Sequence, residues 1–555
     1  MSNFVVMKTA IITFLTTFAA YVAFAFLSEV PEGGAVAAVL QAFADGVLMG
    51  CLSLLLKGPW RLVMIPLLVV IPLFLECQLL YFRCLRGFFS GSILLAGNIF
   101  DPLVIKNAVE AFRAIDLLLF IPWLSAIWMC IKWRTVISEP LPKRTRLTSL
   151  GIALLIFIAE FVRMCGYQIR NEGDSLYKVV RGAAYSYANT PFKTLHEEQG
   201  ATIMMLYSAA EPFMHTQLNN NDLARIKARL KSDDSHPITA NKGKNLIIIL
   251  VESLNSFIMD VEGIEFPTLR TLAADSSSVY VRNVESMVGP GNSADGQLML
   301  TTGLLPLENK PFVSQYADVS FPAIAKALPE YESTEIICED GSLWNHRMTN
   351  VSYGYGSMHD RVAMETFDID RLLFDRLPGL ISTLREPYFA MVTTLGTHSP
   401  YSELEVTPLL PDSVLTNYDD ISRNYLQAMA TVDRSLGEFI QWLKDEGRLE
   451  NTIVVVTGDH AIPAVNTTPA IEDTSVPLII YNAGVDLKSV TRAQQTDLFP
   501  TLLDVMGVGD YILPQTGEPY RGLGQSILDP APRRTVTEDD WALSRKILLG
   551  RFFSR

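Results

Sequence analysis

Hydrophobic positions divide the chain into two parts with different patterns. Within the first 170 residues, five apolar stretches run for about 20 residues each, at positions 9–28, 36–56, 61–82, 113–132 and 148–167. A helix needs about 20 residues to cross the roughly 30 Å of hydrocarbon in a bilayer. Five such runs in succession predict a domain of five transmembrane helices over residues 1–167, with buried helices of a large soluble protein as the alternative.

Basic residues in the connections predict the direction of these helices. The second and fourth connections contain most of them: Lys57, Arg61, Lys132, Arg134, Lys143, Arg144 and Arg146. Cytoplasmic loops are enriched in Lys and Arg, so these two connections and the N-terminus should be cytoplasmic. We therefore predict a multi-pass protein of the cell membrane whose later part is extracytoplasmic, periplasmic or extracellular. A cleaved signal peptide is the competing interpretation of the first run, because Ala23-Phe24-Ala25 is similar to a cleavage box.

The pattern changes after residue 167. Residues 168–243 are polar, with short helical patterns, and we interpret them as a stalk. From 244 to 530, short apolar runs alternate with helical stretches, which predicts an α/β domain with a mostly parallel central sheet. Residues 531–555 follow as a C-terminal tail. The expected strands are Leu246 to Val251, Val279 to Val284, Thr334 to Cys338, Phe389 to Thr393, Ile453 to Val456 and Pro477 to Tyr481.

Charge and cysteine content exclude some classes of protein. The 555 residues have a net charge of -14, made up of +5 over residues 1–170 and -19 over the rest. An acidic external part argues against a nucleic-acid partner, since binding to phosphates requires a positive surface. Only Cys338 lies beyond the apolar part, so a disulfide framework is excluded there.

Candidate chemistry follows two of the expected strands and one glycine-rich turn. Glu252 comes directly after the first strand, and Asp459-His460 follows the strand at Ile453. The carboxylate and imidazole of Asp459-His460 suit Zn or Mn, whereas Glu252 taken alone favours a helix cap over a metal ligand. Ser293 follows a glycine-rich turn and begins a helical run, where it is either a nucleophile close to a metal or a simple N-cap.

Together these motifs resemble those of one enzyme family. The motifs are Val251-Glu-Ser-Leu-Asn-Ser-Phe257, Asn292-Ser-Ala-Asp295, Leu343-Trp-Asn345, Gly396-Thr-His-Ser-Pro400, Thr457-Gly-Asp-His460 and Gln495-Thr-Asp-Leu-Phe-Pro-Thr501. The chain is similar to lipoteichoic-acid-synthase-like phosphoglycerol transferases of the alkaline phosphatase and sulfatase superfamily. Five membrane helices, a stalk and an external catalytic domain are also the organisation that this resemblance implies.

The resemblance implies a role for each matching residue. Four residues should bind one divalent ion, usually Mn²⁺, with Mg²⁺ or Zn²⁺ as alternatives: Glu252, Ser293, Asp459 and His460. Ser293 should also be the nucleophile, and His398 should contact the donor phosphate and assist the leaving or entering oxygen. Trp344, with His346 or Arg347, should hold the glycerol-phosphate end of the substrate.

Two positions depart from the family pattern. The family commonly has Thr at the nucleophile with Lys before it, where this chain has Ser293 after Asn292. In the tryptophan motif, His346 stands at the arginine position and Arg347 is displaced by one residue. Histidine and arginine differ in hydrogen-bond geometry and in permanent charge, so the headgroup that is recognised stays open.

The expected reaction is transfer of a phosphoglycerol headgroup from phosphatidylglycerol, through a phospho-Ser293 intermediate, to a hydroxyl of a cell-envelope glycan, glycolipid or glycerol phosphate polymer. A phosphoethanolamine transferase acting on lipid A or a glycan is the main alternative. A sulfatase is disfavoured because Ser293-Ala-Asp-Gly-Gln297 lacks the Pro and Arg that formylglycine formation requires. A non-catalytic, membrane-anchored binding module is the remaining hypothesis.

Overall fold

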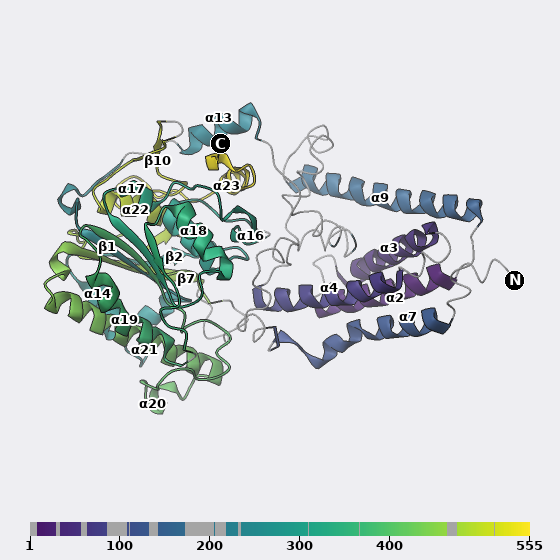
Figure 1. The fold of residues 1–555 in the computed structure, drawn as a ribbon, viewed down its shortest axis with the longest axis horizontal. Coiled ribbons are helices and arrows are strands. Elements are labelled where there is room, and N and C mark those ends of the chain that lie inside the picture. Colours follow the sequence, from purple (N-terminus) through teal and green to yellow (C-terminus); the bar gives the residue numbers. More distant parts are fainter. Residues whose placement is uncertain are drawn as a thin grey trace. The chain divides into compact units, whose positions relative to one another are not determined.

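The computed structural model describes most of the chain as two compact units (Figure 1). The first unit comprises residues 1–95 and 99–214, and the second comprises residues 96–98 and 215–555. The described residues are 8–28, 34–56, 64–85, 108–109, 111–132, 142–171, 202, 205, 218–230, 235–308, 310–365, 367–462, 474–514 and 517–554. Most of the expected stalk, including residues 172–201, lies outside them. The two units are described separately below.

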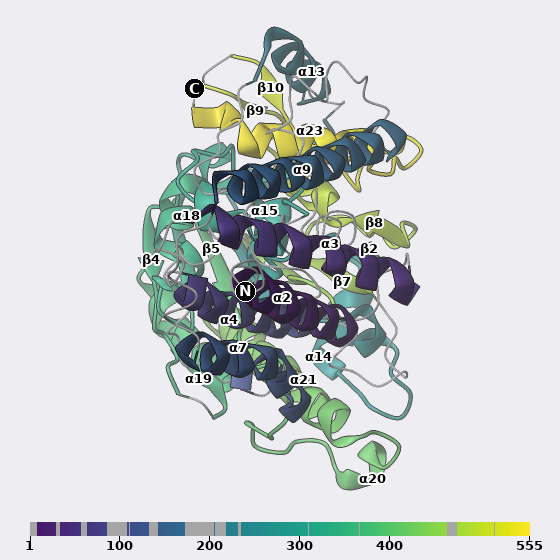
Figure 2. The same cartoon turned by 90° about the vertical axis from the view of Figure 1, so that its right-hand side faces the viewer.

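In the first unit, the described residues of all five expected apolar runs are largely helical, and these helices lie side by side (Figures 1 and 2). These elements are α2 (Lys8–Leu27), α3 (Gly34–Leu55), α4 (Met64–Leu85), the 3-10 helix η3 (Ala114–Leu119), α7 (Ile121–Lys132) and α9 (Lys143–Asn171). Two segments of the described residues, Ala10–Leu27 and Ala38–Leu55, are long and apolar enough to cross a membrane. The predicted number of five crossings stays a prediction.

The second unit is built on an eight-stranded sheet in the order β4-β3-β5-β1-β6-β7-β2-β8. The strands are β1 (Asn245–Val251), β2 (Val279–Glu285), β3 (Glu332–Ile337), β4 (Ser357–His359), β5 (Tyr388–Thr393), β6 (Thr452–Gly458), β7 (Ser475–Tyr481) and β8 (Arg492–Gln494). In this sheet β7 runs antiparallel to both of its neighbours, and the other pairs are parallel. The mostly parallel α/β sheet predicted from the sequence is therefore confirmed.

Every residue of β1 is buried, which explains why its sequence is a continuous apolar run. Its side chains alternate between two hydrophobic cores: Leu246, Ile248 and Leu250 face one, and Ile247, Ile249 and Val251 face the other. Helices therefore cover both faces of the sheet (Figure 1). This arrangement leaves the carboxyl ends of the strands as the edge at which polar side chains can gather.

The helices that contribute to the second of these cores include α14 (Pro267–Ala274), α19 (Ile369–Ser382) and α21 (Asp420–Asp445). The first core is packed by α13 (Asn220–Leu230), α15 (Ser293–Thr302), α17 (Ile324–Ala327), α22 (Leu498–Val505) and α23 (Glu538–Leu549). The remaining helices are α16 (Val313–Tyr316), α18 (His346–Tyr353), α20 (Asp412–Leu415) and the 3-10 helices η5 (Thr239–Asn241), η6 (Ser256–Met259), η7 (Leu343–Asn345), η8 (Leu449–Asn451), η10 (Gln495–Asp497) and η11 (Phe552–Ser554). A small two-stranded sheet pairs β9 (Tyr511–Ile512) with β10 (Pro519–Tyr520).

Segments at both ends of the expected catalytic domain pack against its core. Helix α13 lies within residues 168–243, the expected stalk, and α23 lies within residues 531–555, the expected tail. Leu543 and Ile547 of α23 are buried in the first core, and Arg229 of α13 pairs with Asp540 of α23 at 2.6 Å. The compact unit therefore begins before residue 244 and continues beyond residue 530.

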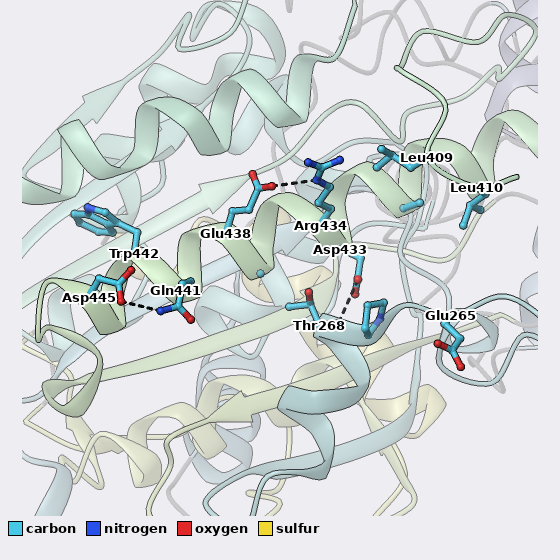
Figure 3. Close-up of a pocket in the computed structure, with 13 residues that line it drawn as sticks. Glu265, Thr268, Leu409, Leu410, Asp433, Arg434, Glu438, Gln441, Trp442 and Asp445 are labelled. Carbon is cyan, nitrogen blue, oxygen red and sulfur yellow. Dashed lines mark hydrogen bonds and ion pairs between the residues drawn. The ribbon is translucent and has the colours of Figure 1, made fainter.

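Helices α14 and α21 are joined by a buried carboxylate (Figure 3). Asp433 of α21 accepts hydrogen bonds from the backbone N–H groups of Thr268, at 3.2 Å, and Leu269, at 2.8 Å. These N–H groups belong to the first turn of α14 and have no partner within that helix. A cavity of about 720 Å³ lies beside this contact, and none of the residues that line it is a predicted site residue.

We predict that Asp433→Ala lowers the free energy of unfolding by about 1–3 kcal/mol, because it leaves two buried N–H groups without an acceptor. Glu438→Ala is the matched control on the same helix, since Glu438 pairs with Arg434 at the surface and its loss should cost at most about 0.5 kcal/mol. Denaturant unfolding of the purified protein, followed by circular dichroism, measures both values. Equal losses in the two variants would contradict the capping role.

Candidate metal centre and nucleophile

The candidate site forms where β1 and β6 end side by side. These strands pair in parallel with Val251 opposite Gly458, so the residues that follow them emerge at the same edge. Glu252 is next after β1, and Asp459 and His460 are next after β6. One potential ligand atom from each of these three residues lies within 4.8 Å of the other two. All three side chains are buried.

Ser293 joins this cluster from the first turn of α15. Its hydroxyl oxygen donates a hydrogen bond to Glu252 Oε2 at 2.9 Å. The helix start presents backbone N–H groups and the positive end of the helix dipole, which stabilise an anion. The structure thus brings together all four residues that the sequence predicted as metal ligands. Their role as ligands stays a prediction.

His460 has the orientation that metal-binding histidines adopt. Its Nδ1 lies 2.9 Å from the Ala461 carbonyl oxygen, which can only accept, so Nδ1 carries the hydrogen. Its Nε2 faces the carboxylates, 3.2 Å from Glu252 Oε1 and 3.7 Å from Asp459 Oδ2. A carbonyl that fixes the ring in this way is the usual second partner of a metal-bound imidazole.

Burial makes the charges of the cluster strongly interdependent. Burial opposes ionisation of Glu252, but the His460 and His398 imidazoles outweigh it and hold the pKa of that carboxyl well below its usual range. Burial, reinforced by the Glu252 charge, raises the pKa of Asp459. For His460, burial disfavours the cation, but Asp459 and Glu252 outweigh it and raise the pKa of the ring. The cluster therefore requires positive charge among its carboxylates.

Asp459 supplies a direct test of whether a metal ion fits this site. Its Oδ1 accepts from the backbone N–H groups of Ser253, at 2.8 Å, and His460, at 2.6 Å, whereas its buried Oδ2 has no hydrogen-bond partner. Buried polar atoms are normally paired, and an unpaired one calls for an explanation such as an ion. Carboxylate and hydroxyl oxygens together with one imidazole form a donor set suited to Mn²⁺, Mg²⁺ or Zn²⁺.

Ser253 holds two of the predicted ligands in register, a role that the sequence did not reveal. Its hydroxyl donates to Glu252 Oε1 at 2.8 Å, and its N–H donates to Asp459 Oδ1. Ser253 has a φ of 53°, an uncommon left-handed conformation for a residue other than glycine. Tyr425 supports it by donating to the Ser253 carbonyl oxygen at 2.8 Å. Such backbone strain is often found at functional sites.

Helix α15 reaches the cluster because a glycine faces the Asp459 backbone. A Cβ atom added to Gly296 would lie 2.0 Å from the Asp459 carbonyl oxygen, so no other residue fits there without a shift. Asp295 folds the preceding turn by accepting from the N–H groups of Gly289 and Gly291, each at 2.9 Å. A Cβ atom would lie 2.4 Å from the Leu307 carbonyl oxygen at Gly289 and 2.3 Å from Asp295 Oδ1 at Gly291, so close packing also requires the glycines before Ser293.

His398 lies in the loop after β5, which also contacts Glu252. Thr397 Oγ1 donates to the Glu252 carbonyl oxygen at 2.5 Å, and the His398 charge contributes to the lowered pKa of the Glu252 carboxyl. His398 Nδ1 lies 2.6 Å from the Ser399 carbonyl oxygen and must donate to it. The Nε2 atom is thus the ring nitrogen that is left for proton transfer.

Trp344, His346 and Arg347 lie on η7 and the start of α18, and both basic residues are paired. His346 Nε2 is 3.3 Å from Glu339, and its Nδ1 is 3.7 Å from Glu335. Burial disfavours its cation, but these two glutamates outweigh it and raise the pKa of His346 to about 10. Arg347, with 57% of its side chain exposed, pairs with Asp360 at 2.5 Å and with Asp340 at 3.3 Å.

A buried hydrogen-bond network links the segment that contains His346 to the nucleophile helix. Gln297, one turn after Ser293 on α15, donates to Glu335 Oε1 at 2.6 Å. Asn350 of α18 donates to Glu335 Oε2 at 3.0 Å. Trp344 itself has a φ of 47°, which kinks the chain between η7 and α18. The sequence did not indicate the part played by Glu335, because its partners lie on other segments.

Residues 244–508 match the family model described as Sulfatase. This part of the chain is a sulfatase-family domain, and the resemblance inferred from the sequence is confirmed. The chain is 24% identical over 479 residues to lipoteichoic acid synthase 2 of Bacillus subtilis (strain 168), covering 79% of this chain and 71% of that protein. It is 24% identical over 521 residues to lipoteichoic acid synthase 1 of the same organism, covering 85% of this chain and 77% of that protein.

A solved structure also aligns with part of the chain. The lipoteichoic acid synthase LtaP from Listeria monocytogenes aligns with a TM-score of 0.46 and 20% sequence identity, covering 60% of this chain and 98% of that chain.

We predict that Ser253→Ala weakens binding of a divalent ion by about 10–100-fold, because it removes the hydroxyl that orients Glu252. Ser256→Ala is the matched control: Ser256 is equally buried, but its hydroxyl donates to the Arg282 carbonyl oxygen. Calorimetric titration with Mn²⁺ measures both affinities. An unchanged affinity in Ser253→Ala, or the same loss in both variants, would refute the orienting role.

Proposed function

We propose that this protein is a membrane-anchored, divalent-metal-dependent phosphoglycerol transferase. It transfers phosphoglycerol from phosphatidylglycerol, through phospho-Ser293, to a hydroxyl of a cell-envelope glycan, glycolipid or glycerol phosphate polymer. The observation that carries the proposal is the hydrogen bond of the half-buried Ser293 hydroxyl to Glu252, which belongs to the buried cluster of Glu252, Asp459 and His460. The curated relatives described above, which are named lipoteichoic acid synthases, support the same reaction class.

The anchoring helices favour transfer from a lipid over hydrolysis of a soluble ester. A lipid donor stays in the bilayer, and an enzyme tethered to that bilayer meets it at a high effective concentration. The apolar helices α2 and α3 support this tether. We place the catalytic unit on the extracytoplasmic side of the cell membrane, because the basic connections near residues 57–61 and 132–146 favour the cytoplasm.

The first step begins at Ser293. Its Oγ attacks the phosphorus of the donor, the new Oγ–P bond forms, and the P–O bond to diacylglycerol breaks. A divalent ion held by Glu252, Ser293, Asp459 and His460 would lower the pKa of the hydroxyl and neutralise charge on the phosphoryl oxygens. The N–H groups at the start of α15 add fixed positive potential for the same charge.

His398 handles the protons of both steps. Because its Nδ1–H is bound to the Ser399 carbonyl oxygen, Nε2 is the reactive nitrogen. Nε2 donates a proton to the departing diacylglycerol oxygen, and in the second step it accepts one from the acceptor hydroxyl that attacks phospho-Ser293. His398 loses one proton in the first step and regains one in the second, and Ser293, which a bound divalent ion would keep ionised, exchanges none, so the enzyme returns to its initial state.

Headgroup recognition is assigned to the segment that contains Trp344. The tryptophan ring offers an apolar surface for the carbon atoms of the headgroup, and His346, which lies between Glu335 and Glu339, has a pKa raised to about 10. Arg347 is likewise paired with two carboxylates, and it is the weaker candidate because its side chain is largely exposed. Histidine at the position where the resemblance implies arginine leaves phosphoethanolamine as the alternative headgroup.

We predict that Ser293→Ala abolishes release of diacylglycerol and that Ser293→Thr retains it within about tenfold, because threonine keeps the hydroxyl. Assays in lipid nanodiscs with Mn²⁺ and fluorescent phosphatidylglycerol measure the release. Mass spectrometry of the acid-quenched enzyme should find a phosphoglycerol adduct on Ser293. Continued release by Ser293→Ala would refute the covalent scheme, and full metal binding without any turnover would favour a binding module.

We predict that phosphatidylglycerol is used at least about tenfold more efficiently, in kcat/KM, than phosphatidylethanolamine, which corresponds to about 1.4 kcal/mol of discrimination. The same nanodisc assay with each lipid at equal density measures the ratio. A preference for phosphatidylethanolamine would transfer the assignment to a phosphoethanolamine transferase while leaving the serine mechanism intact.

A further inference from the structure

Asp370 is a buried carboxylate next to the loop that contains His398, and the proposed mechanism assigns it no role. It is the second residue of α19 and only 2% exposed. Its Oδ1 accepts hydrogen bonds from two successive backbone N–H groups, those of Leu395 at 2.8 Å and Gly396 at 2.9 Å. Both residues lie in the short loop between β5 and His398.

The two N–H groups that Asp370 binds lie at the start of the turn that leads to His398. The Leu395 carbonyl oxygen accepts from the His398 N–H at 3.0 Å, so the two residues close a tight turn. Within the same turn, Thr397 Oγ1 donates to the Glu252 carbonyl oxygen. The His398 backbone is therefore fixed from two sides, by Asp370 at its start and by Glu252 near its end.

The fit between Asp370 and this loop leaves almost no free space. A Cβ atom added to Gly396 would lie 2.8 Å from Asp370 Oδ2, so the loop can approach the carboxylate only as glycine. The Oδ2 atom is itself buried and has no hydrogen-bond partner. An unpaired buried oxygen costs stability, and proteins tolerate that cost mainly where a precise geometry is needed.

We propose that Asp370 is a positioning residue for His398, holding the Leu395–His398 turn so that the imidazole meets the transferred phosphoryl group. This inference rests on the proposed function, which gives His398 its role in proton transfer. Asp370 acts only through the loop backbone. A displacement of about 1 Å at such a catalytic group can reduce turnover by about 100-fold.

The chain offers a closely matched control two residues earlier. Asp368 precedes α19, is 4% exposed, and accepts from the Thr407 N–H at 2.7 Å and the Thr407 hydroxyl at 2.8 Å. It thus ties the same helix start to a different loop, and it also accepts from Arg371 Nε at 3.2 Å. Asp368→Ala should cost similar stability without moving the His398 turn.

The experiment compares variants of the full-length protein in lipid nanodiscs, using diacylglycerol release for kcat and KM and thermal unfolding for stability. We expect Asp370→Ala to lower kcat by about 10–100-fold with little change in KM, because the turn loses its anchor. Asp370→Asn keeps an acceptor oxygen and should stay within about threefold of the wild type. Asp368→Ala should match Asp370→Ala in thermal stability while retaining kcat.

A double-mutant cycle with His398→Ala tests whether Asp370 acts through the imidazole. If it does, Asp370→Ala causes no further loss of kcat once His398 is alanine. Equal kcat losses in Asp370→Ala and Asp368→Ala, or an undiminished Asp370 effect without the imidazole, would overturn the inference. If Asp370→Ala does not fold, Gly396→Ala provides the same cycle, since its methyl group pushes the turn away from Oδ2. Full activity of His398→Ala would instead overturn the role given to His398 in the proposed function, and with it this inference.

Discussion

The candidate site depends on one electrostatic constraint, the confinement of two carboxylates and an imidazole in a volume from which water is excluded. Glu252 and Asp459 directly follow adjacent paired strands, whose register brings them side by side. Without a metal ion, the two carboxylates raise the pKa of His460 and favour its cation. A divalent ion would replace that proton, because metal-binding imidazole must be neutral. Positive charge in this position therefore offsets the repulsion between the two carboxylates.

The surrounding structure holds these groups mainly through backbone hydrogen bonds to buried side chains. Ser253 fixes the carboxylates of Glu252 and Asp459, Asp295 folds the turn before Ser293, and Asp370 fixes the turn before His398. In Asp295 and in Asp370, one carboxylate oxygen accepts hydrogen bonds from two N–H groups of a glycine-containing loop, while the other oxygen is buried and has no hydrogen-bond partner. The same arrangement thus fixes the turn before Ser293 and the loop that contains His398, and it lets these short loops remain rigid beside the candidate site.

Hydrophobic patterning predicted most of the fold, because the central strands are buried on both faces. All six expected strands are present, and β1 is the clearest, with a continuous apolar sequence and complete burial. The patterning missed β4 and β8, which have three residues each and are only partly buried, so neither produces an apolar run. It also missed the packing of α23, since an amphipathic helix after residue 530 looks like a surface tail until its partners in the core are known.

The sequence predicted only those site residues that stand next to a strand or helix with a recognisable pattern. Glu252 and Asp459 come directly after strands, and Ser293 begins a helix. Their positions along the chain therefore already indicated that these residues gather at one edge of a sheet. The pairing of His346 with Glu335 and Glu339 could not be read in this way, because Glu335 lies within β3, where a buried charge contradicts the pattern. The residues that donate hydrogen bonds to Glu335 come from α15 and α18, which are other segments of the chain. A buried glutamate inside a strand is therefore the signal that was available, and it indicated a network that joins the segment containing His346 to α15.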